Sequence, residues 1–358
     1  MNPADDAPSV IANITSALRA TSREKWAQRV FSLFISIGLL ALVLWQVDWV
    51  SFGLYWSRLS SGALFISLAF YLALNIFRAL RFRALLAQPD LPQMALLPIT
   101  LYHNFLVRLL PFKLGEVSYV LLLKQKLGVP SRAGISSLFA ARLLELLVIV
   151  VVAVFALLES GDLFSAEQWT LVLALMLSSL ALVSLALMGA GPLLRLLVRP
   201  WSGCSGWRSA LHARLMTLAQ ELDDLRQPRR LWPSLLWSVF TYMCSALSVL
   251  ATMWALDVRL SLLPTVIFLS LGMFALAFPF NISGFGLVDL SWAFGLMALA
   301  NWPAQEAVAA GFMLNATQML FAVVGGLLAY VWLYLLPSPK PTPKNAGFSQ
   351  VRAENQEN

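Results

Sequence analysis

The sequence predicts an all-α polytopic membrane protein with about six spanning helices and two opposed re-entrant hairpins in an inverted repeat. Three observations predict this fold class. The 358 residues are 59% hydrophobic and only 12% charged, whereas a soluble domain carries about 25% charged residues. Several apolar runs reach the roughly 20 residues that a helix needs to cross hydrocarbon. Two further apolar segments are each interrupted by proline and glycine, at corresponding places in the two halves of the chain.

The apolar runs give the positions of the spanning helices. We expect spans at Val30–Val47, Gly62–Phe77, Gly134–Leu158, Trp169–Met188, Trp232–Ala255 and Ala307–Trp332. Residues 1–29 are a polar tail before a run long enough to span, so the first span predicts an uncleaved anchor and not a signal peptide. Residues 337–358 begin with a proline-rich stretch and predict a disordered tail.

Basic residues predict the orientation, because cytoplasmic loops collect Lys and Arg. Most of the 25 basic residues fall in the N-terminal tail, in alternate loops or in the C-terminal tail. One of these loops follows the second span and holds Arg78, Arg81 and Arg83. The opposite loops hold only Arg58 and Arg259. The pattern predicts a protein of the cell inner membrane with both termini in the cytoplasm.

Two apolar segments do not fit as simple crossings. Met94–Leu123 is interrupted at Pro111–Glu116, and the part after the break is too short to span. It ends beside Lys124 and Lys126, so we expect a hairpin that enters from the cytoplasm and returns there. Leu262–Ala300 is interrupted at Pro279–Gly286 and, by parity, opens to the outside. The alternative is a proline or glycine kink in an ordinary pair of helices.

The order span, hairpin, span therefore occurs twice, in a first unit at residues 62–158 and a second at 232–332, with opposite orientation. Paired discontinuous segments in inverted repeats indicate a substrate site near the midplane of the membrane. Irregular backbone at membrane depth is tolerated only where it is buried in protein or lines a wet cavity.

Two motifs give a family resemblance. Leu110–Glu116 reads LPFKLGE and is similar to an LPxxxGE signature, which is followed by Arg142–Glu145, reading RLLE. Ser283–Asp289 reads SGFGLVD and is similar to a GGxGxxE signature, with Ser283 in place of the first glycine and Asp289 in place of glutamate. Over about residues 30–336 the chain resembles the flippase-like transmembrane region of lysylphosphatidylglycerol synthase. The synthases also carry a soluble aminoacyl-transfer domain, which lies outside this resemblance. The resemblance therefore implies lipid translocation and not lysyl transfer.

Charged residues at membrane depth indicate a polar cavity. A central charge costs about 2.5–3.5 kcal/mol on insertion scales unless it is paired or hydrated. Arg142 and Glu145 are three apart and share a helix face. Arginine and lysine pair well with phosphate, and a half-helix that begins near Ser283 would direct N–H groups at an anion. The candidate headgroup-binding residues are Arg108, Lys113, Glu116, Arg142, Glu145, Asn281, Ser283, Gly284, Gly286 and Asp289.

Each candidate also has a structural interpretation. The charges could be internal ion pairs that lock the helices together, and Arg108 could extend to the membrane surface. Asn281 and Gly284 could only shape the turn. Gly325 and Gly326 in the last span predict close helix packing.

The loop at residues 189–230 contains an apolar stripe with helical spacing, formed by Leu211, Leu215, Leu218, Leu222 and Leu225. We expect a cytoplasmic amphipathic helix that lies on the inner leaflet, where anionic lipids attract its arginines. Packing on a partner helix or on the protein's own spans is the alternative.

The functional expectation is a lipid flippase or transporter for an anionic or modified membrane lipid. No phosphate-binding loop of the GxxxxGK[ST] type is present, no Cys or His spacing indicates a metal site, and we expect no cofactor and no nucleic-acid partner. One alternative is a membrane-embedded transferase acting on a lipid-linked sugar or aminoacyl group. However, no tight acidic pair stands in an outer loop, so we expect no enzyme activity. A third possibility is an accessory subunit of a separate lipid-modifying enzyme.

Overall fold

A computed structural model gives two compact units, residues 1–47 and 48–358. It describes Gly53 and residues 59–86, 88, 91–92, 94–110, 114–158, 166–201, 207–260, 262–277, 287–300 and 302–335, all within the second unit. The predicted first span Val30–Val47, both terminal tails and the two hairpin tips lie outside the described residues.

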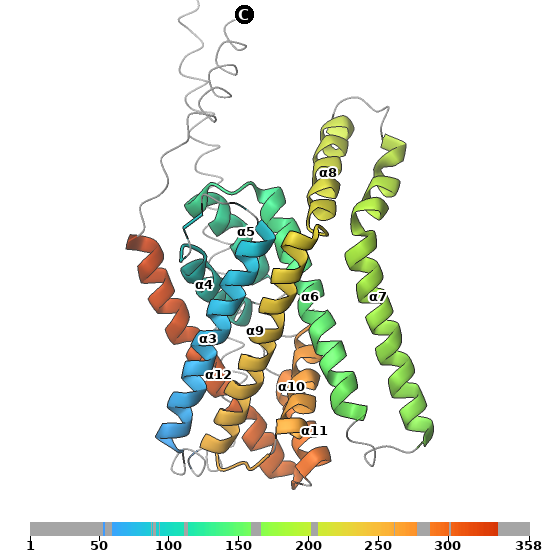
Figure 1. Ribbon diagram of the computed structural model, residues 1–358. Helices are drawn as coiled ribbons and strands as arrows, with labels where there is room; N and C mark the ends of the chain where they lie inside the picture. Colours follow the sequence, from blue (N-terminus) through green and yellow to red (C-terminus); the bar gives the residue numbers. More distant parts are fainter. Residues whose placement is uncertain are drawn as a thin grey trace, which may run out of the picture. The chain divides into compact units, whose positions relative to one another are not determined.

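The described residues form helices and no strand, which confirms the all-α prediction (Figure 1). Within the described ranges, five helices are long and apolar enough to cross a membrane, and each overlaps a predicted span. The helices are α3 (Ser61–Leu86), α4 (Leu96–Leu109), α5 (Leu114–Leu127), α6 (Ser131–Leu158), α7 (Ala166–Val198), α8 (Trp207–Asp224), α9 (Pro228–Ala255), α10 (Leu262–Ala277), α11 (Leu287–Ala300) and α12 (Ala304–Leu335), with a 3-10 turn at Arg199–Trp201.

Two spans run past their predicted ends. Helix α7 continues beyond Met188 to Val198. Helix α3 continues beyond Phe77 to Leu86, so Arg78, Arg81 and Arg83 belong to the helix and not to a loop. The extension of α3 is stabilised by burial of Phe82 and Leu85, an apolar gain that offsets part of the cost of burying the Arg81 charge. The prediction that these arginines lie in a loop was wrong.

Each interrupted segment forms a pair of short helices, α4 with α5 and α10 with α11. Their lengths of 14 to 16 residues correspond to about 21–24 Å at 1.5 Å per residue. That is less than the roughly 30 Å of a hydrocarbon core. Figure 1 shows the two pairs at opposite ends of the bundle, as the inverted repeat predicts. The re-entrant passage itself stays a prediction.

The packing of the helices follows the repeat. Helix α3 packs along α9, its counterpart in the second unit. Helix α4 contacts α12, and its counterpart α10 contacts α6 in the same way. Likewise α5 contacts α6 where α11 contacts α12. Exchange of the two units therefore reproduces these contacts, with the α3–α9 pair at the centre.

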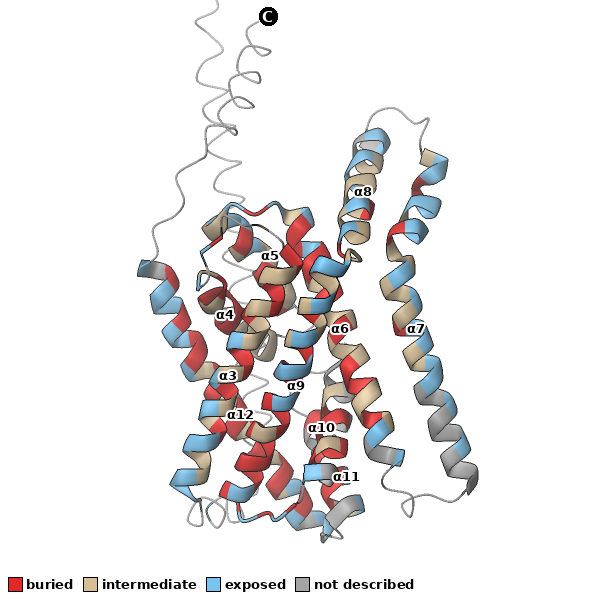
Figure 2. Ribbon diagram, viewed as in Figure 1, coloured by how far each residue is buried: buried red, intermediate tan, exposed pale blue. Residues whose placement is uncertain are grey.

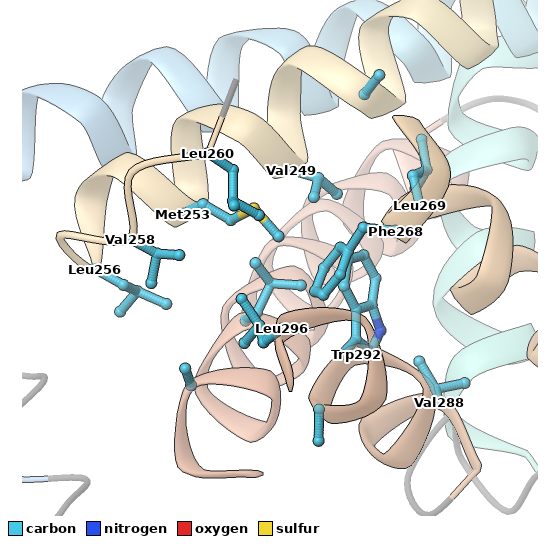
Figure 3. Packing of buried hydrophobic residues seen from close by; sticks show 14 of the residues in the cluster. Val249, Met253, Leu256, Val258, Leu260, Phe268, Leu269, Val288, Trp292 and Leu296 are labelled. Atoms are coloured by element: carbon cyan, nitrogen blue, oxygen red, sulfur yellow. The ribbon is translucent and has the colours of Figure 1, made fainter. Parts of the chain in front are cut away.

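Buried residues gather on the inner faces of the repeat helices (Figure 2). In the second unit, Phe268 of α10 and Trp292 of α11 pack edge to face with ring centroids 4.3 Å apart (Figure 3). In the first unit, Phe82 stacks on Tyr119 at 4.3 Å. Large apolar side chains such as Phe65 and Leu328 are exposed on the outside. Such a surface suits lipid and would be unusual on a soluble monomer.

Helix α8 packs on the protein itself at its C-terminal end. Leu225 is buried, and Leu222 packs against the same cluster of buried residues from α3 and α6. Arg132 of α6 forms an ion pair with Glu221 of α8 at 3.2 Å. At these positions the apolar stripe packs on the protein's own helices. This agrees with the alternative interpretation and not with the expected position on the inner leaflet.

The glycine pair in α12 allows close packing, as predicted. A Cβ on Gly326 would overlap the Phe105 side chain of α4, and one on Gly325 would touch Leu101. Helix α12 therefore lies directly against α4. Lys126 at the end of α5 donates to the carbonyl of Leu333 at 2.7 Å, where a positive charge also complements the C-terminus of α12.

Candidate functional site

A cavity of about 350 Å³ lies between the two repeat units. Its wall includes residues from all eight helices of the repeat, α3–α6 and α9–α12, and none from α7 or α8. The volume is within the range of small-molecule sites. The first unit supplies all the charged residues of this wall among those described, and the second unit supplies apolar and neutral polar ones. The described charges of the cavity therefore all lie on the side of the first unit.

Glu145 of α6 is the centre of an ion network in this wall. One carboxylate oxygen, Oε1, lies 3.5 Å from Arg78 Nη2. The other, Oε2, accepts from Arg142 Nη1 at 2.9 Å and lies 3.9 Å from Arg81 Nη2. The Arg81 side chain is 1% exposed. A buried guanidinium of this kind needs a carboxylate nearby, because an unpaired charge in the interior is costly.

Arg142 also connects α6 to the first hairpin. Its Nε lies 3.2 Å from Glu116 Oε1 on α5. The two groups form an ion pair, but the N–H does not point at the oxygen closely enough for a hydrogen bond. Glu116 and Arg142 were both predicted as headgroup-binding residues from sequence, and the structure places them side by side. The ion-pair interpretation is thus also realised, since the charges of these residues partly compensate one another.

Gly115 and His103 explain why the first motif needs its glycine. A Cβ on Gly115 would collide with the backbone of Leu106 and Val107, so α5 begins in close contact with α4. The ring Nδ1 of buried His103 donates to the Gly115 carbonyl at 3.0 Å. This approach holds the next residue, Glu116, within reach of α6.

Four of the predicted site residues come together in the cavity wall: Arg108, Glu116, Arg142 and Glu145. Lys113, Asn281, Ser283, Gly284 and Gly286 lie outside the described residues. Asp289 lies in α11, but its side chain is not among those described. Val288 and Trp292 of the same helix line the cavity, so α11 reaches the site.

Arg78 and Arg81 also line the cavity, although the sequence predicts them in a loop. That prediction follows from the apolar run before them, which ends at Phe77. A signal was present, since residues 79–86 keep apolar side chains between the arginines, and Arg78 and Arg81 have the i,i+3 spacing of one helix face. Asn104 and Tyr71 were missed too. They form a hydrogen bond at 3.0 Å in the same wall.

The cavity wall holds N–H donors that have no acceptor. Within the described chain, five buried side-chain N–H groups lack an aligned acceptor, and four of them belong to lining residues. These are the Nε groups of Arg78, Arg81 and Arg142 and the indole Nε1 of Trp292. Guanidinium and indole groups can only donate, and a buried donor without a partner is costly. A ligand rich in acceptors would complete the site.

The charged groups of the cavity wall suit an anion. Among the described residues no group of three or more His, Cys, Asp or Glu side chains could hold a metal ion. The lining instead combines four arginines with two glutamates, together with neutral polar and apolar residues. Arginine forks match the oxygens of phosphate and carboxylate groups.

A comparison with known protein families shows where this chain belongs. A family model described as the lysylphosphatidylglycerol synthase TM region matches residues 29–326. No curated protein and no solved structure matches significantly. The matched range contains every lining residue of the cavity, from Tyr71 to Gln318.

Proposed function

The chain belongs to the family of the lysylphosphatidylglycerol synthase transmembrane region, and from this premise we propose that it moves an anionic or modified membrane lipid between leaflets. The headgroup would cross through the arginine-lined cavity while the acyl chains stay in the bilayer. The observation that carries the proposal is the cluster of donor-only N–H groups in a cavity shared by both repeat units.

The charge of the cavity supports an anionic headgroup. Arg78, Arg81 and Arg142 surround Glu145, and their unused Nε groups have no acceptor in the described protein. Phosphate oxygens accept several hydrogen bonds and tolerate the fork geometry of guanidinium. The apolar part of the wall, which includes Leu269 and Met273, suits the part of a lipid next to its headgroup.

The repeat supports alternating exposure of the site. Rocking of one inverted unit against the other is the usual way to expose a central site to each side in turn. The α3–α9 pair at the centre contains buried hydroxyls, with Ser67 Oγ 2.7 Å from the Ser248 carbonyl and 2.6 Å from Thr252 Oγ1. We propose that the units move about this pair.

We propose an inner-membrane location with both termini in the cytoplasm. The end of the bundle that carries α8 and the α4–α5 hairpin also carries Arg83, Lys124, Arg132 and Arg229. Arg259 is at the end where α9 leads into α10. By the positive-inside rule the basic end faces the cytoplasm.

We expect transport and not catalysis, and we propose the lipid bilayer and a lipid substrate as the partners. A separate lipid-modifying enzyme could supply the substrate. Mass spectrometry of the lipids after the transport assay distinguishes these cases, because a transferase changes the mass of its lipid and a flippase does not.

The test is translocation in proteoliposomes. Full-length protein is reconstituted with a labelled phosphatidylglycerol, and label in the outer leaflet is quenched with an impermeant reagent. Lipid that crosses during the assay changes the quenchable fraction. We expect faster crossing than in empty vesicles, and loss of most of that rate in Arg142→Gln. Equal rates in empty vesicles and in vesicles with the parent protein, for every anionic lipid tried, would rule the function out.

A further inference from the structure

The charge balance of the cavity identifies a narrower substrate class. Six arginine and glutamate side chains that line it are described: Arg78, Arg81, Arg108, Arg142, Glu116 and Glu145. Among the described side chains, four arginines against two glutamates leave a surplus of two positive charges. His103 adds no charge to this total, because a neutral imidazole can donate its Nδ1 proton to the Gly115 carbonyl.

The ion pairs show where the surplus lies. Glu145 is shared by Arg78, Arg81 and Arg142, and Glu116 serves Arg142 alone. Two carboxylates therefore face three guanidinium groups. Arg108, in the last turn of α4, lines the cavity with no carboxylate within 4 Å in the described chain. The network of three arginines and two glutamates thus has one positive charge in excess. Arg108 adds a second positive charge to the same cavity wall.

The unpaired donors lie with the surplus charge. The Arg81 side chain is 1% exposed, and its Nε has no acceptor in the described protein. Nε groups of Arg78 and Arg142 are unsatisfied in the same way, although Arg142 has a carboxylate nearby. Three unsatisfied Nε donors on α3 and α6 call for a ligand with several acceptor oxygens. A phosphate with three terminal oxygens presents more acceptors and more charge than a bridging phosphodiester does.

We propose that the cavity binds a dianionic lipid phosphate, a phosphomonoester or diphosphate headgroup, in preference to a monoanionic phosphodiester. The proposal rests on the proposed function for the lipid nature of the ligand, and on the charge count for its class. Two negative charges neutralise the surplus, and the terminal oxygens accept from the unpaired guanidinium groups. A phosphodiester leaves one positive charge without compensation in a site of low dielectric, where such a charge interacts strongly.

The test compares two lipids that differ by one methyl group and one charge, phosphatidic acid and phosphatidylmethanol with the same acyl chains. Binding to the full chain in detergent is titrated at about pH 8, above a second phosphate pKa of about 6. We expect phosphatidic acid to bind about tenfold more tightly, a difference of about 1.4 kcal/mol. Equal affinity for the two lipids overturns the proposal.

Arg108→Gln tests the origin of the preference. This change removes a guanidinium that forms no ion pair with any carboxylate in the described part of the chain. We expect the ratio of the two affinities to fall to about one in the variant, because the surplus charge is then about one. Arg229→Gln, an exposed arginine at the start of α9, removes the same charge from the chain and should keep the ratio. If Arg108→Gln keeps the full preference, the charge count does not govern binding.

Inorganic phosphate separates a lipid site from a site for the free ion. We expect it to compete with phosphatidic acid only weakly, because it lacks the acyl chains. Competition at equal concentration would overturn the lipid assignment. The vesicle assay keeps the two proposals distinct. If phosphatidylmethanol binds and crosses as well as phosphatidic acid, only the dianion proposal fails. If no anionic lipid crosses, the transport function fails instead.

Discussion

Arg142 of α6 and Glu116 of α5 lie 3.2 Å apart and join the first hairpin to the spanning helix that follows it. The same guanidinium donates to Glu145 on its own helix at 2.9 Å. Glu145 in turn lies close to Arg78 and Arg81 of α3. Three helices of one repeat unit are therefore held together by charges that face the cavity, and any ligand that competes for Arg142 acts on all three.

Removal of Glu145 should destabilise the protein. Glu145→Gln removes the carboxylate shared by Arg78 and Arg81 and leaves Arg142 with Glu116 alone. Loss of one partner from a fully buried ion pair costs about 3–5 kcal/mol, which is an upper bound for this partly exposed network. We expect a clear drop in the midpoint of thermal unfolding in detergent. A second change, Arg81→Met, removes one of the stranded charges and should restore part of the loss.

Glu221→Gln is the matched control for that experiment. Glu221 pairs with Arg132 at the surface, and exposed pairs contribute about 0–1 kcal/mol. Its unfolding midpoint should stay close to that of the parent. If the two glutamine variants unfold alike, Glu145 is not a buried counter-ion.

Gly115→Ala should separate the two helices of the first hairpin. The added methyl collides with the backbone of Leu106 and Val107, which cannot move aside as a side chain can. We expect a loss of about 1–3 kcal/mol, typical of overpacking, together with slower translocation, since Glu116 moves with Gly115. Both are measured on the same reconstituted sample.

Gly189→Ala shows what the same substitution does in open space. Gly189 lies in α7, and nothing is within 4 Å of a Cβ added there. Alanine is the better helix former by about 1 kcal/mol, so this variant should be as stable as the parent or more stable. Equal damage from both substitutions would argue against a close contact at Gly115.

The topology can be tested by cysteine labelling. Cys204 and Cys244 are first replaced by serine and alanine, and single cysteines are then placed at Gln125 and at Arg259, both exposed. An impermeant thiol reagent should label Gln125→Cys only from the cytoplasmic side and Arg259→Cys only from outside. Gln125 is preferred to Lys126, whose amine bonds Leu333. Labelling of both from one side would contradict the opposed hairpins.

The sequence predicted the helices better than the cavity, for a physical reason. Apolar runs and breaks are local features, so the five described spans and the two short-helix pairs could be located in advance. The end of α3 could not, because burial of Phe82 and Leu85 keeps Arg81 helical and this burial comes from distant helices. Arg108, Glu116, Arg142 and Glu145 were found because charge is unusual at membrane depth. Trp292 was not found, because a tryptophan in an apolar run looks like core.

Trp292 distinguishes a ligand-binding role from a packing role. Its ring packs on Phe268 at 4.3 Å, and its Nε1 is buried without an acceptor in the described protein. Trp292→Phe keeps an aromatic ring and removes the donor. Loss of an unsatisfied buried donor offsets part of the cavity left by the smaller ring. We therefore expect the unfolding midpoint to change little, while translocation falls about tenfold if the indole donates to the headgroup, a typical cost for one lost hydrogen bond to a charged group. Both measurements are made on protein that elutes as a single species. A variant that translocates at the parent rate would make the indole a packing group only, and would leave the arginines of the first unit to hold the headgroup alone.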